Sequence, residues 1–255
     1  MYLGIVPAHG GTHHDPSACL VADGHIIAFV EQERMSRKKH ATGQFPVEAI
    51  EECLEIGDIY LSNVDSIGLS RNYDNRKKSF WRLARRGFRS SSSSTLERLF
   101  DSTVVPVKQA YAHTNGDLRS ITTSRLGDHF DVDAEDIPPI NFLNHHMTHA
   151  ASAFYPSGFD EALVVSLDNY GGHLSGGIYF GRGDNIETKT TFKRFNSLGR
   201  FYGDFTEYLG FRRSNGEGKV MGLAPYGSHN EEVARVVSSY YSVADGQYDV
   251  EELTF

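Results

Sequence analysis

The sequence predicts an α/β protein made of two similar lobes, the second of them incomplete. Two observations support this prediction. Short apolar segments typical of strands alternate with segments that have the apolar spacing of helices. In addition, the order strand, glycine-rich loop, strand, turn, strand occurs twice, once at the N-terminus and once after residue 158. A chain of 255 residues can form one large domain or two smaller lobes.

The first copy of this pattern opens the chain. Tyr2–Pro7 is an apolar strand, Ala8–Pro16 a loop rich in glycine and histidine, and Ser17–Val21 a second strand. Asp23-Gly24 favours a hairpin turn, after which His25–Glu31 continues as a third strand. The rest of this part is expected to contain a helix, a strand, a helix and a strand, at Phe45–Gly57, Ser66–Ser70, Asp117–Phe130 and Ile140–Leu143.

The second copy follows a helix that ends near Pro156. Ala162–Leu167 is its first strand, Asp168–Gly172 a glycine-rich loop, and Gly176–Phe180 its second strand. A turn at Arg182-Gly183-Asp184 leads to a third strand at Thr188–Phe195.

Two such units indicate the duplicated lobes of the actin-like, ribonuclease-H-like (ASKHA) architecture, in which the loop after each first strand grips phosphate. The first lobe is expected at 1–158, with a helical insertion around 71–130, and the start of the second at 159–255.

Composition argues against several classes of protein. The net charge of −8 gives no support to a general role in binding nucleic acid or membrane surfaces. No segment approaches eighteen consecutive apolar residues, and the N-terminus lacks the basic region of a secretion signal. The two cysteines, Cys19 and Cys53, form neither a zinc spacing nor a disulfide framework, so a cytoplasmic protein is expected.

One stretch departs from this acidic balance. Cations crowd residues 76–89 and a serine run follows at 90–94, which indicates a basic helix leading into a loop. Such a helix can face a phosphorylated ligand or an RNA backbone, and it can equally be a solvated surface.

The strongest chemical feature is the segment Asn144-His145-His146-Met147-Thr148-His149. On a helix, His145 and His149 lie one turn apart on the same face, where two imidazoles can bind one divalent metal. Asp168, at the end of an apolar strand, is a suitable third ligand. Histidines at this spacing also occur as capping or packing groups, and that alternative stays open.

Two further segments carry polar chemistry near the N-terminus. His14 and Asp15 form a pair in which a carboxylate can orient an imidazole for general-base work, while Asp before Pro is also a common turn former. In Glu31–His40, Lys39 and His40 can neutralise a phosphate, or they can belong to a solvated helix end.

The glycines of Ser214–Gly227 predict a close approach of the backbone to a ligand. Glu217 can accept hydrogen bonds from ribose hydroxyls and Lys219 can meet a phosphate. The segment matches neither a P-loop nor a dinucleotide-binding fingerprint.

Taken in order, these segments resemble one family. HDPSACLVADGHIIAFVEQERMSRKKH, NHHMTHAASAFY, ALVVSLDNYGG, SLGRFYGDFTEYLGF and GEGKVMGLAPYG are similar to the carbamoyltransferases that act on nodulation factors, cephamycins and aminoglycosides. The resemblance is dense over 1–50 and 140–227 and weak over 71–130. Long motifs matched in order are more specific than any one of them.

The resemblance implies a reaction in two parts. A YrdC-like domain makes carbamoyl-adenylate from ATP and carbamoyl phosphate, and the actin-like part transfers the carbamoyl group to a hydroxyl of a sugar or antibiotic-like acceptor. His145, His149 and Asp168 would hold a divalent metal, with iron(II) as first choice and zinc(II) as the alternative. His14 with Asp15 would act near the acceptor hydroxyl and Lys39 near the carbamoyl phosphate. The residues that would line the nucleotide are Gly171, Gly172, Glu217, Lys219, Gly222 and Gly227.

The sequence also departs from that family. Its members are more than twice as long, so a YrdC-like domain and the later part of the second lobe, with a fourth aspartate ligand, are not found in these 255 residues. Where the family has Asp-Gly after the strand, this sequence has Asp168-Asn169. Asn tolerates a positive φ better than most residues, so the turn is expected to be kept.

Three functions therefore stay open. The first is O-carbamoyl transfer with a partner chain that supplies the YrdC-like domain, or as a homodimer. The second is a non-catalytic relative that binds a nucleotide or a partner, and the third is tRNA modification of the threonylcarbamoyl type, which the acidic net charge disfavours.

Overall fold

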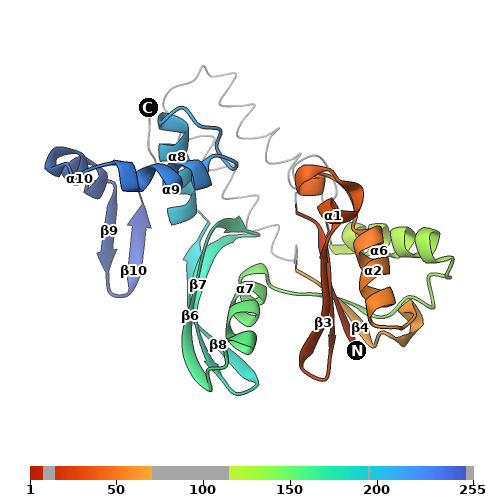
Figure 1. Cartoon of the computed structure of the whole chain (residues 1–255). Coiled ribbons are helices and arrows are strands. Elements are labelled where there is room, and N and C mark those ends of the chain that lie inside the picture. Colours follow the sequence, from red (N-terminus) through yellow and green to blue (C-terminus); the bar gives the residue numbers. More distant parts are fainter. Residues whose placement is uncertain (8–14, 71–114, 195, 251–255) are drawn as a thin grey trace, which may run out of the picture. The chain divides into compact units, whose positions relative to one another are not determined.

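The computed structural model describes residues 1–7, 15–70, 115–194 and 196–250, with no account of the side chains of 115–117. The chain divides into two compact units, Met1–Asn144 and His145–Phe255 (Figure 1). The division thus falls before the helix at 145–154, whereas the sequence placed the boundary after it, at 158/159. Each unit is treated by itself below.

Unit 1 is built on a five-stranded mixed sheet. Its strands are β1 (Tyr2–Val6), β2 (Ser17–Ala22), β3 (His25–Glu31), β4 (Ser66–Leu69) and β5 (Ile140–Phe142), in the order β3-β2-β1-β4-β5. The first three strands form an antiparallel meander, whereas β4 pairs with β1 in parallel and β5 pairs with β4 in parallel. Asp23 and Gly24 both have positive φ, as a tight hairpin turn requires.

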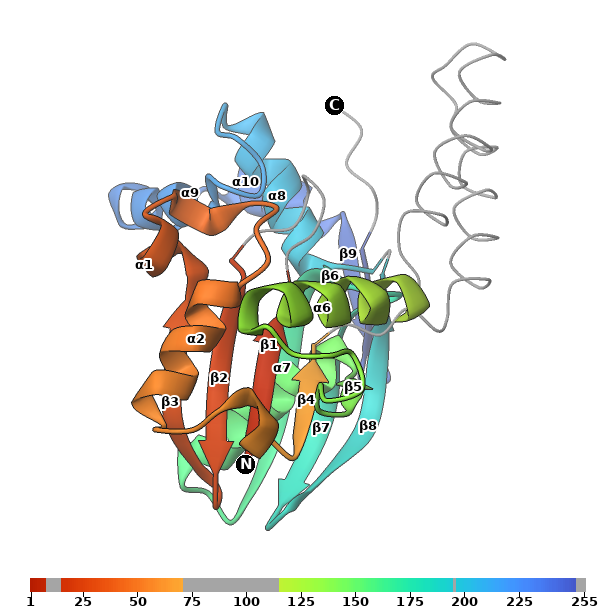
Figure 2. The ribbon, with the colours of Figure 1, turned by 90° about the vertical axis from the view of Figure 1, so that its right-hand side faces the viewer.

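Helices cover one face of this sheet. Unit 1 contains α1 (Gln32–Ser36), η1 (Lys39–Ala41), α2 (Val47–Ile56), η2 (Leu61–Asn63) and α6 (Asn115–Phe130). The apolar side of α2 carries Ile50 and Cys53, and both are fully buried with Leu3, Leu20 and Ile67 of the sheet. Figure 2 shows α2 and α6 lying in front of the same sheet. Alternation along the strands thus places one set of side chains in the core and leaves the other set outside it.

Unit 2 begins with α7 (His145–Phe154) and η4 (Tyr155–Ser157) and continues with a second antiparallel meander. Its strands are β6 (Glu161–Gly171), β7 (Leu174–Arg182) and β8 (Asn185–Lys193). Helix α7 packs on β6 and β7 through a core of Ala150, Phe154, Val164 and Tyr179. Gly181 makes this packing possible, because a Cβ there would lie 2.6 Å from the ring of Phe154.

The last part of unit 2 consists of α8 (Leu198–Tyr208), α9 (Glu217–Leu223), η5 (Ala224–Tyr226), α10 (Glu231–Ser238), β9 (Tyr241–Ala244) and β10 (Gln247–Val250). Side chains cap two of these helices. The Ser197 hydroxyl accepts from the N–H of Arg200, and the Asn230 carbonyl accepts from the N–H of Val233. Strands β9 and β10 form a separate two-stranded hairpin.

The structure confirms the mixed α/β class, and the strand meander occurs in both units as expected. The duplication of whole lobes stays a prediction. One local expectation is wrong: Asp168–Gly172 is not a loop, because β6 continues to Gly171 through a register shift after Leu167. The basic stretch at 76–89 lies outside the described residues. Among the described helices, none is both long and apolar enough to cross a membrane.

Candidate metal centre

Helix α7 places two histidines side by side. It begins at His145, so His145 and His149 project from one face, one turn apart. Their ring centroids are 4.5 Å apart, and their Nε2 atoms are separated by 3.0 Å. The spacing argument is therefore met by the geometry, with both Nε2 atoms directed to the same point.

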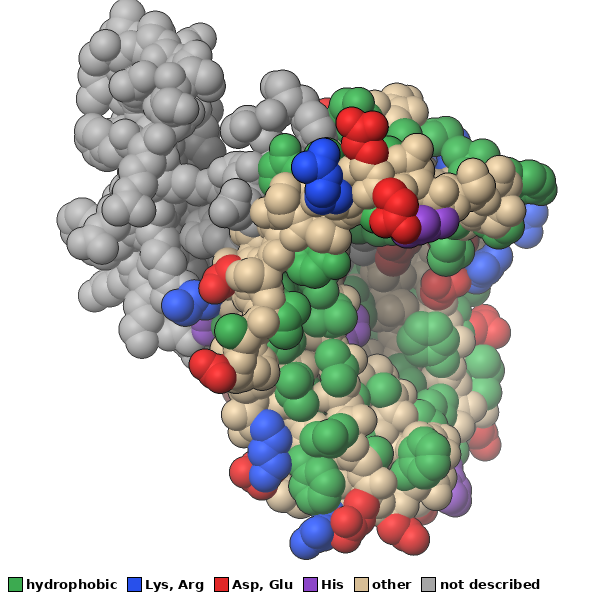
Figure 3. Space-filling model, turned by 90° about the vertical axis from the view of Figure 1, so that its left-hand side faces the viewer, with side chains coloured by type: hydrophobic (Ala, Val, Ile, Leu, Met, Phe, Trp, Pro, Cys, Tyr) green, Lys and Arg blue, Asp and Glu red, His purple; other side chains and the backbone are tan. Residues whose placement is uncertain are grey.

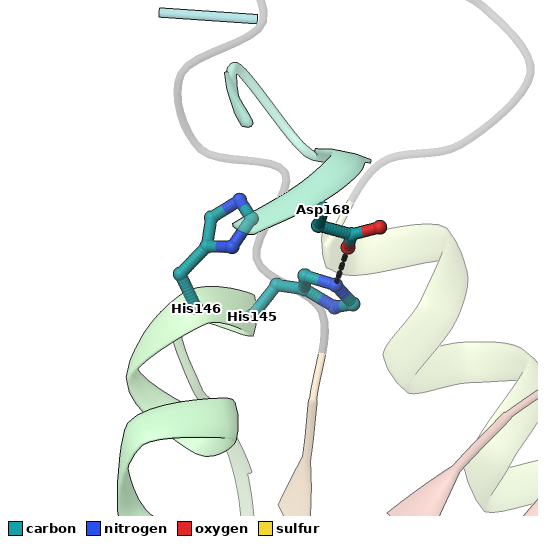
Figure 4. A group of neighbouring side chains, drawn as sticks. All are labelled: His145, His146 and Asp168. Atoms are coloured by element: carbon teal, nitrogen blue, oxygen red, sulfur yellow. Dashed lines mark hydrogen bonds and ion pairs between the residues drawn. The ribbon is translucent and has the colours of Figure 1, made fainter. Parts of the chain in front are cut away.

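Asp168 brings a carboxylate to the same point from strand β6 (Figure 4). Its Oδ2 lies 2.8 Å from Nε2 of His145 and 3.8 Å from Nε2 of His149. Its Oδ1 accepts a hydrogen bond from the N–H of Asn169 at 2.6 Å. Hydrogen bonds from His145 and His149 hold the pKa of the Asp168 carboxyl well below its usual range, so this group is ionised at neutral pH.

The three donor atoms form a compact set suited to a divalent cation. Ligands about 2.1 Å from one metal ion lie about 3.0 to 3.5 Å from each other, and the separations of 2.8, 3.0 and 3.8 Å bracket this range. Two imidazole nitrogens and one carboxylate oxygen suit iron(II) and zinc(II) alike. The side chains of His145 and Asp168 are about one-third exposed, so the donor set is accessible from solvent.

His146 lies next to this set but serves a different purpose. It is fully buried, and its Nδ1 lies 3.3 Å from the hydroxyl of Ser166 on β6. A ring nitrogen of His146 lies within 4.8 Å of the donor atoms of His145 and Asp168. In Figure 4, however, its ring is turned away from the pair that those two residues form. Burial lowers the pKa of His146, which keeps this imidazole neutral. His149 is therefore the better third ligand.

Close backbone approaches fix the ligands in place. A Cβ on Gly171 would lie 1.9 Å from the ring of His145, so only glycine fits there. A Cβ on Gly199, in the first turn of α8, would lie 2.7 Å from the backbone carbonyl carbon of Asp168. The Ser197 hydroxyl that caps α8 also donates to the carbonyl oxygen of Asp168 at 2.8 Å. Sequence reasoning did not identify Ser166 or Ser197, although the alternation along β6 places Ser166 and Asp168 on one face.

The residues expected to act on the acceptor belong to unit 1. His14 lies outside the described residues. Asp15 contacts His40, with Oδ1 2.9 Å from Nδ1, and Glu33 accepts from the N–H of His40 at 2.7 Å. Lys39 lies in η1 with an exposed side chain. The structure thus pairs Asp15 with His40, a contact that the sequence did not predict.

The expected nucleotide-binding residues are spread over two regions of unit 2. Gly171 contacts His145, and Gly172 has a φ of 66° in the turn between β6 and β7. The segment with Glu217 and Lys219 is a short helix rather than an open loop, and Glu217 accepts from the N–H of Ser214 at 2.7 Å. Its other expected residues, Gly222 and Gly227, are exposed on α9 and at the end of η5. Nucleotide binding by these residues stays a prediction.

Comparison with known proteins gives a family match over nearly the whole chain. The family model described as "Carbamoyltransferase N-terminus" matches residues 9–255. An uncharacterized protein of Synechocystis sp. is 35% identical over 219 residues, which cover 84% of this chain and 33% of the relative. Nodulation protein NolNO of Sinorhizobium fredii is 35% identical over 214 residues, which cover 84% of this chain and 28% of the relative. The chain thus spans about a third of the length of these relatives.

A solved structure gives a weaker likeness. YeaZ from Pseudomonas aeruginosa aligns with a TM-score of 0.35 and 10% identity, covering 73% of this chain and 62% of YeaZ. A TM-score of this size does not establish a common fold.

Proposed function

Because the chain belongs to the carbamoyltransferase N-terminus family, we propose that it carries the metal-binding part of an O-carbamoyltransferase. The acceptor is a hydroxyl of a sugar or antibiotic-like molecule. The observation that carries the proposal is the convergence of three donor atoms, from His145, His149 and Asp168, in one unit.

The carbamoyl donor in this proposal is carbamoyl-adenylate, made from ATP and carbamoyl phosphate. His145, His149 and Asp168 would hold iron(II) or zinc(II). When bound, such a metal supplies a Lewis acid that stabilises negative charge on a carbonyl or phosphoryl oxygen. Asp168 contributes a full negative charge to the site, because its pKa is held low by the two histidines.

The other proposed roles rest on residues of both units. His14, oriented by Asp15, receives the proton of the acceptor hydroxyl, and Lys39 neutralises the phosphate end of the carbamoyl donor. The nucleotide contacts Gly171, Gly172, Glu217, Lys219, Gly222 and Gly227. The YrdC-like activity that forms the adenylate lies outside these 255 residues.

The first prediction tests the metal site. Purified chain stripped with chelator should take up about one equivalent of zinc(II), or of iron(II) under anaerobic conditions. His145→Ala should weaken this binding by more than about 100-fold, a loss larger than that typical of residues outside the ligand set. The measurement is a competition titration against a metallochromic chelator.

His229→Ala is the matched control for that experiment. His229 is an exposed histidine of the same unit, paired with Glu231 and not with the donor set. If His145→Ala left metal uptake unchanged, or if His229→Ala reduced it equally, the proposed metal site would be contradicted. The proposed function would then lose its basis.

A further inference from the structure

Unit 1 contains a cavity whose lining residues have no part in the proposed function. The cavity has a volume of about 520 Å³ and lies between α1, the loop from η1 to α2, the start of α2 and the later part of α6. Figure 2 shows α6 beside this end of α2. Cavities that bind small molecules typically measure about 300 to 1,000 Å³. This one is therefore large enough for a small organic ligand.

Two buried side chains line the cavity, Gln32 and Phe45, which are 1% and 8% exposed. Both ends of the Gln32 amide are held in place. Its oxygen accepts from the N–H of Ala49 at 3.2 Å, and its nitrogen donates to a carboxylate oxygen of Glu48. That nitrogen carries a second hydrogen, which these contacts leave for a ligand. The cavity thus offers a fixed polar donor beside the apolar ring of Phe45.

Four ionised side chains of both signs line the same cavity. Lys38 and Arg125 are cations, whereas Glu48 and Asp128 are anions. Among the described residues, no ion pair of 4.0 Å or less joins a cation of this set to an anion of it. The carboxylates accept from neutral donors instead, Glu48 from the Gln32 amide and Asp128 from the hydroxyl of Ser124 at 3.3 Å. Their charges are therefore left for solvent or for a ligand to balance.

This arrangement favours a ligand that itself carries both signs of charge. Arg125 and Asp128 are three residues apart on α6 and so project from one face of the helix. A ligand with charge of one sign only would be attracted by two of the four groups and repelled by the other two. A ligand with both signs can be attracted by all four.

We propose that this cavity binds a small zwitterion with an ammonium group and a carboxylate, the chemistry of free amino acids and dipeptides. The carboxylate binds to Lys38 and Arg125, and the ammonium group binds to Glu48 and Asp128. Phe45 packs against the carbon chain of the ligand. The four charges of the cavity sum to zero, so a ligand without net charge leaves the balance of the site unchanged.

A ligand in this cavity would also hold the segment that carries Lys39 and His40. Lys38 and residues 43–45 line the cavity on either side of these two residues, and His40 in turn contacts Asp15. Binding should therefore restrict the motion of this segment. The site is separate from the candidate metal centre, because its residues belong to unit 1 and the metal ligands to unit 2.

The experiment screens the purified chain against the common L-amino acids and a set of dipeptides by saturation-transfer NMR. The tightest binder is then titrated by calorimetry. Lys38→Gln and Asp128→Asn should each weaken binding by at least about tenfold, because each removes a charged partner of the ligand. Arg37→Gln and Asp131→Asn are the matched controls. Both residues are exposed neighbours that do not line the cavity, so these changes should leave the affinity unchanged.

Inorganic phosphate and putrescine test whether both signs of charge are needed. Each offers only one sign, so each should bind at least about tenfold more weakly than the zwitterion. Hydrogen exchange with the bound zwitterion should show new protection of amides in residues 36–48, which form one side of the cavity.

Three outcomes overturn the proposal: no zwitterion binds at about millimolar concentration, phosphate or putrescine binds as tightly, or the control variants lose as much affinity as Lys38→Gln and Asp128→Asn. All four variants change exposed side chains, and circular dichroism checks that they are folded. Failure here is distinct from failure of the proposed function, because metal uptake through His145 is measured separately.

Discussion

The two faces of the β6-β7-β8 sheet differ in what they are built to do. On the covered face, Val164 and Tyr179 are packed under α7, and glycines at 177 and 181 leave room for the rings of Tyr179 and Phe154. On the other face, Leu163, Val165 and Leu167 are each more than half exposed, and Figure 3 shows hydrophobic side chains gathered there. The covered face also holds the candidate ligand Asp168, which needs a fixed rotamer to bind a metal, whereas the bare face has the composition of an association surface.

Unit 1 shows the same asymmetry in a milder form. Leu20 and Ala28 of neighbouring strands are buried under α2, while Cys19 is partly exposed and its cross-strand neighbour Phe29 is 61% exposed. The contrast between faces is thus a property of both meanders, and side chains on either face give separate tests of it.

The largest effect is expected from Tyr179→Ala on the covered face. Tyr179 is 2% exposed and packs with Phe154 and Val164, so its removal leaves a cavity that the sheet cannot close. We expect a loss of about 3 to 5 kcal/mol in the free energy of unfolding, measured by urea denaturation with circular dichroism.

Val165→Ala is the matched change on the bare face. Its side chain is 57% exposed, so the loss in the isolated chain should stay within about 0.5 kcal/mol. If Tyr179→Ala and Val165→Ala lost the same free energy of unfolding, the bare face would be as well packed in solution as the covered face. The proposed difference between the two faces would then be wrong.

The strands and the side-by-side placement of His145 and His149 could be predicted from the sequence, because both follow from regular periods. Alternation of two defines the faces of a strand, and a spacing of four puts His145 and His149 on one side of a helix. Glycine content was a poorer guide. Gly171 serves close packing against His145, and the segment with Glu217 and Lys219 is a short helix held by a contact to Ser214.

The position of His146 could not be derived from spacing alone. Which histidine of the motif faces Asp168 and which faces Ser166 depends on where β6 passes, and that is a tertiary contact between residues about twenty positions apart. The same holds for the contact of His40 with Asp15, which joins the loop before β2 to the 3-10 helix η1.

An intermediate effect is expected from His146, which links α7 to β6 through Ser166. His146→Leu fills the space but loses the contact to the hydroxyl, so the helix with two ligands is less firmly set against the strand with the third. We expect metal affinity to fall about 10- to 100-fold, as is typical of residues that orient ligands. The measurement is the same competition titration with chelator.

His146→Asn distinguishes positioning from simple packing, because its amide nitrogen occupies the place of Nδ1. It should restore most of the metal affinity, even though it leaves more empty space than leucine does. Ser166→Ala should reproduce the loss caused by His146→Leu. If metal affinity followed side-chain volume instead, with Asn worse than Leu, the positioning role would be refuted.

The smallest effect concerns Cys19 and Cys53, the two thiols of unit 1. Their reactivity compares the two faces of the unit 1 sheet and does not measure stability at neutral pH. Burial raises the pKa of Cys53 to about 11, and Cys53 is fully enclosed by the core under α2. A free thiol has a pKa of about 8.5, so the unfolded chain ionises first and the folded chain keeps its proton. The contribution of Cys53 to stability is therefore complete below about pH 8.5 and is lost as pH rises toward 11.

Alkylation by iodoacetamide, followed by peptide mass spectrometry, makes this visible. At pH 8 Cys53 should react far more slowly than Cys19, because only about one in a thousand of its thiols is ionised and none is exposed. Cys19 on the other face is partly accessible, and burial raises its pKa as well, so its rate should lie between that of Cys53 and that of a free thiol. Equal rates for both cysteines at pH 8 would mean that the core under α2 opens as readily as the outer face, and the distinction between faces would then not hold for unit 1.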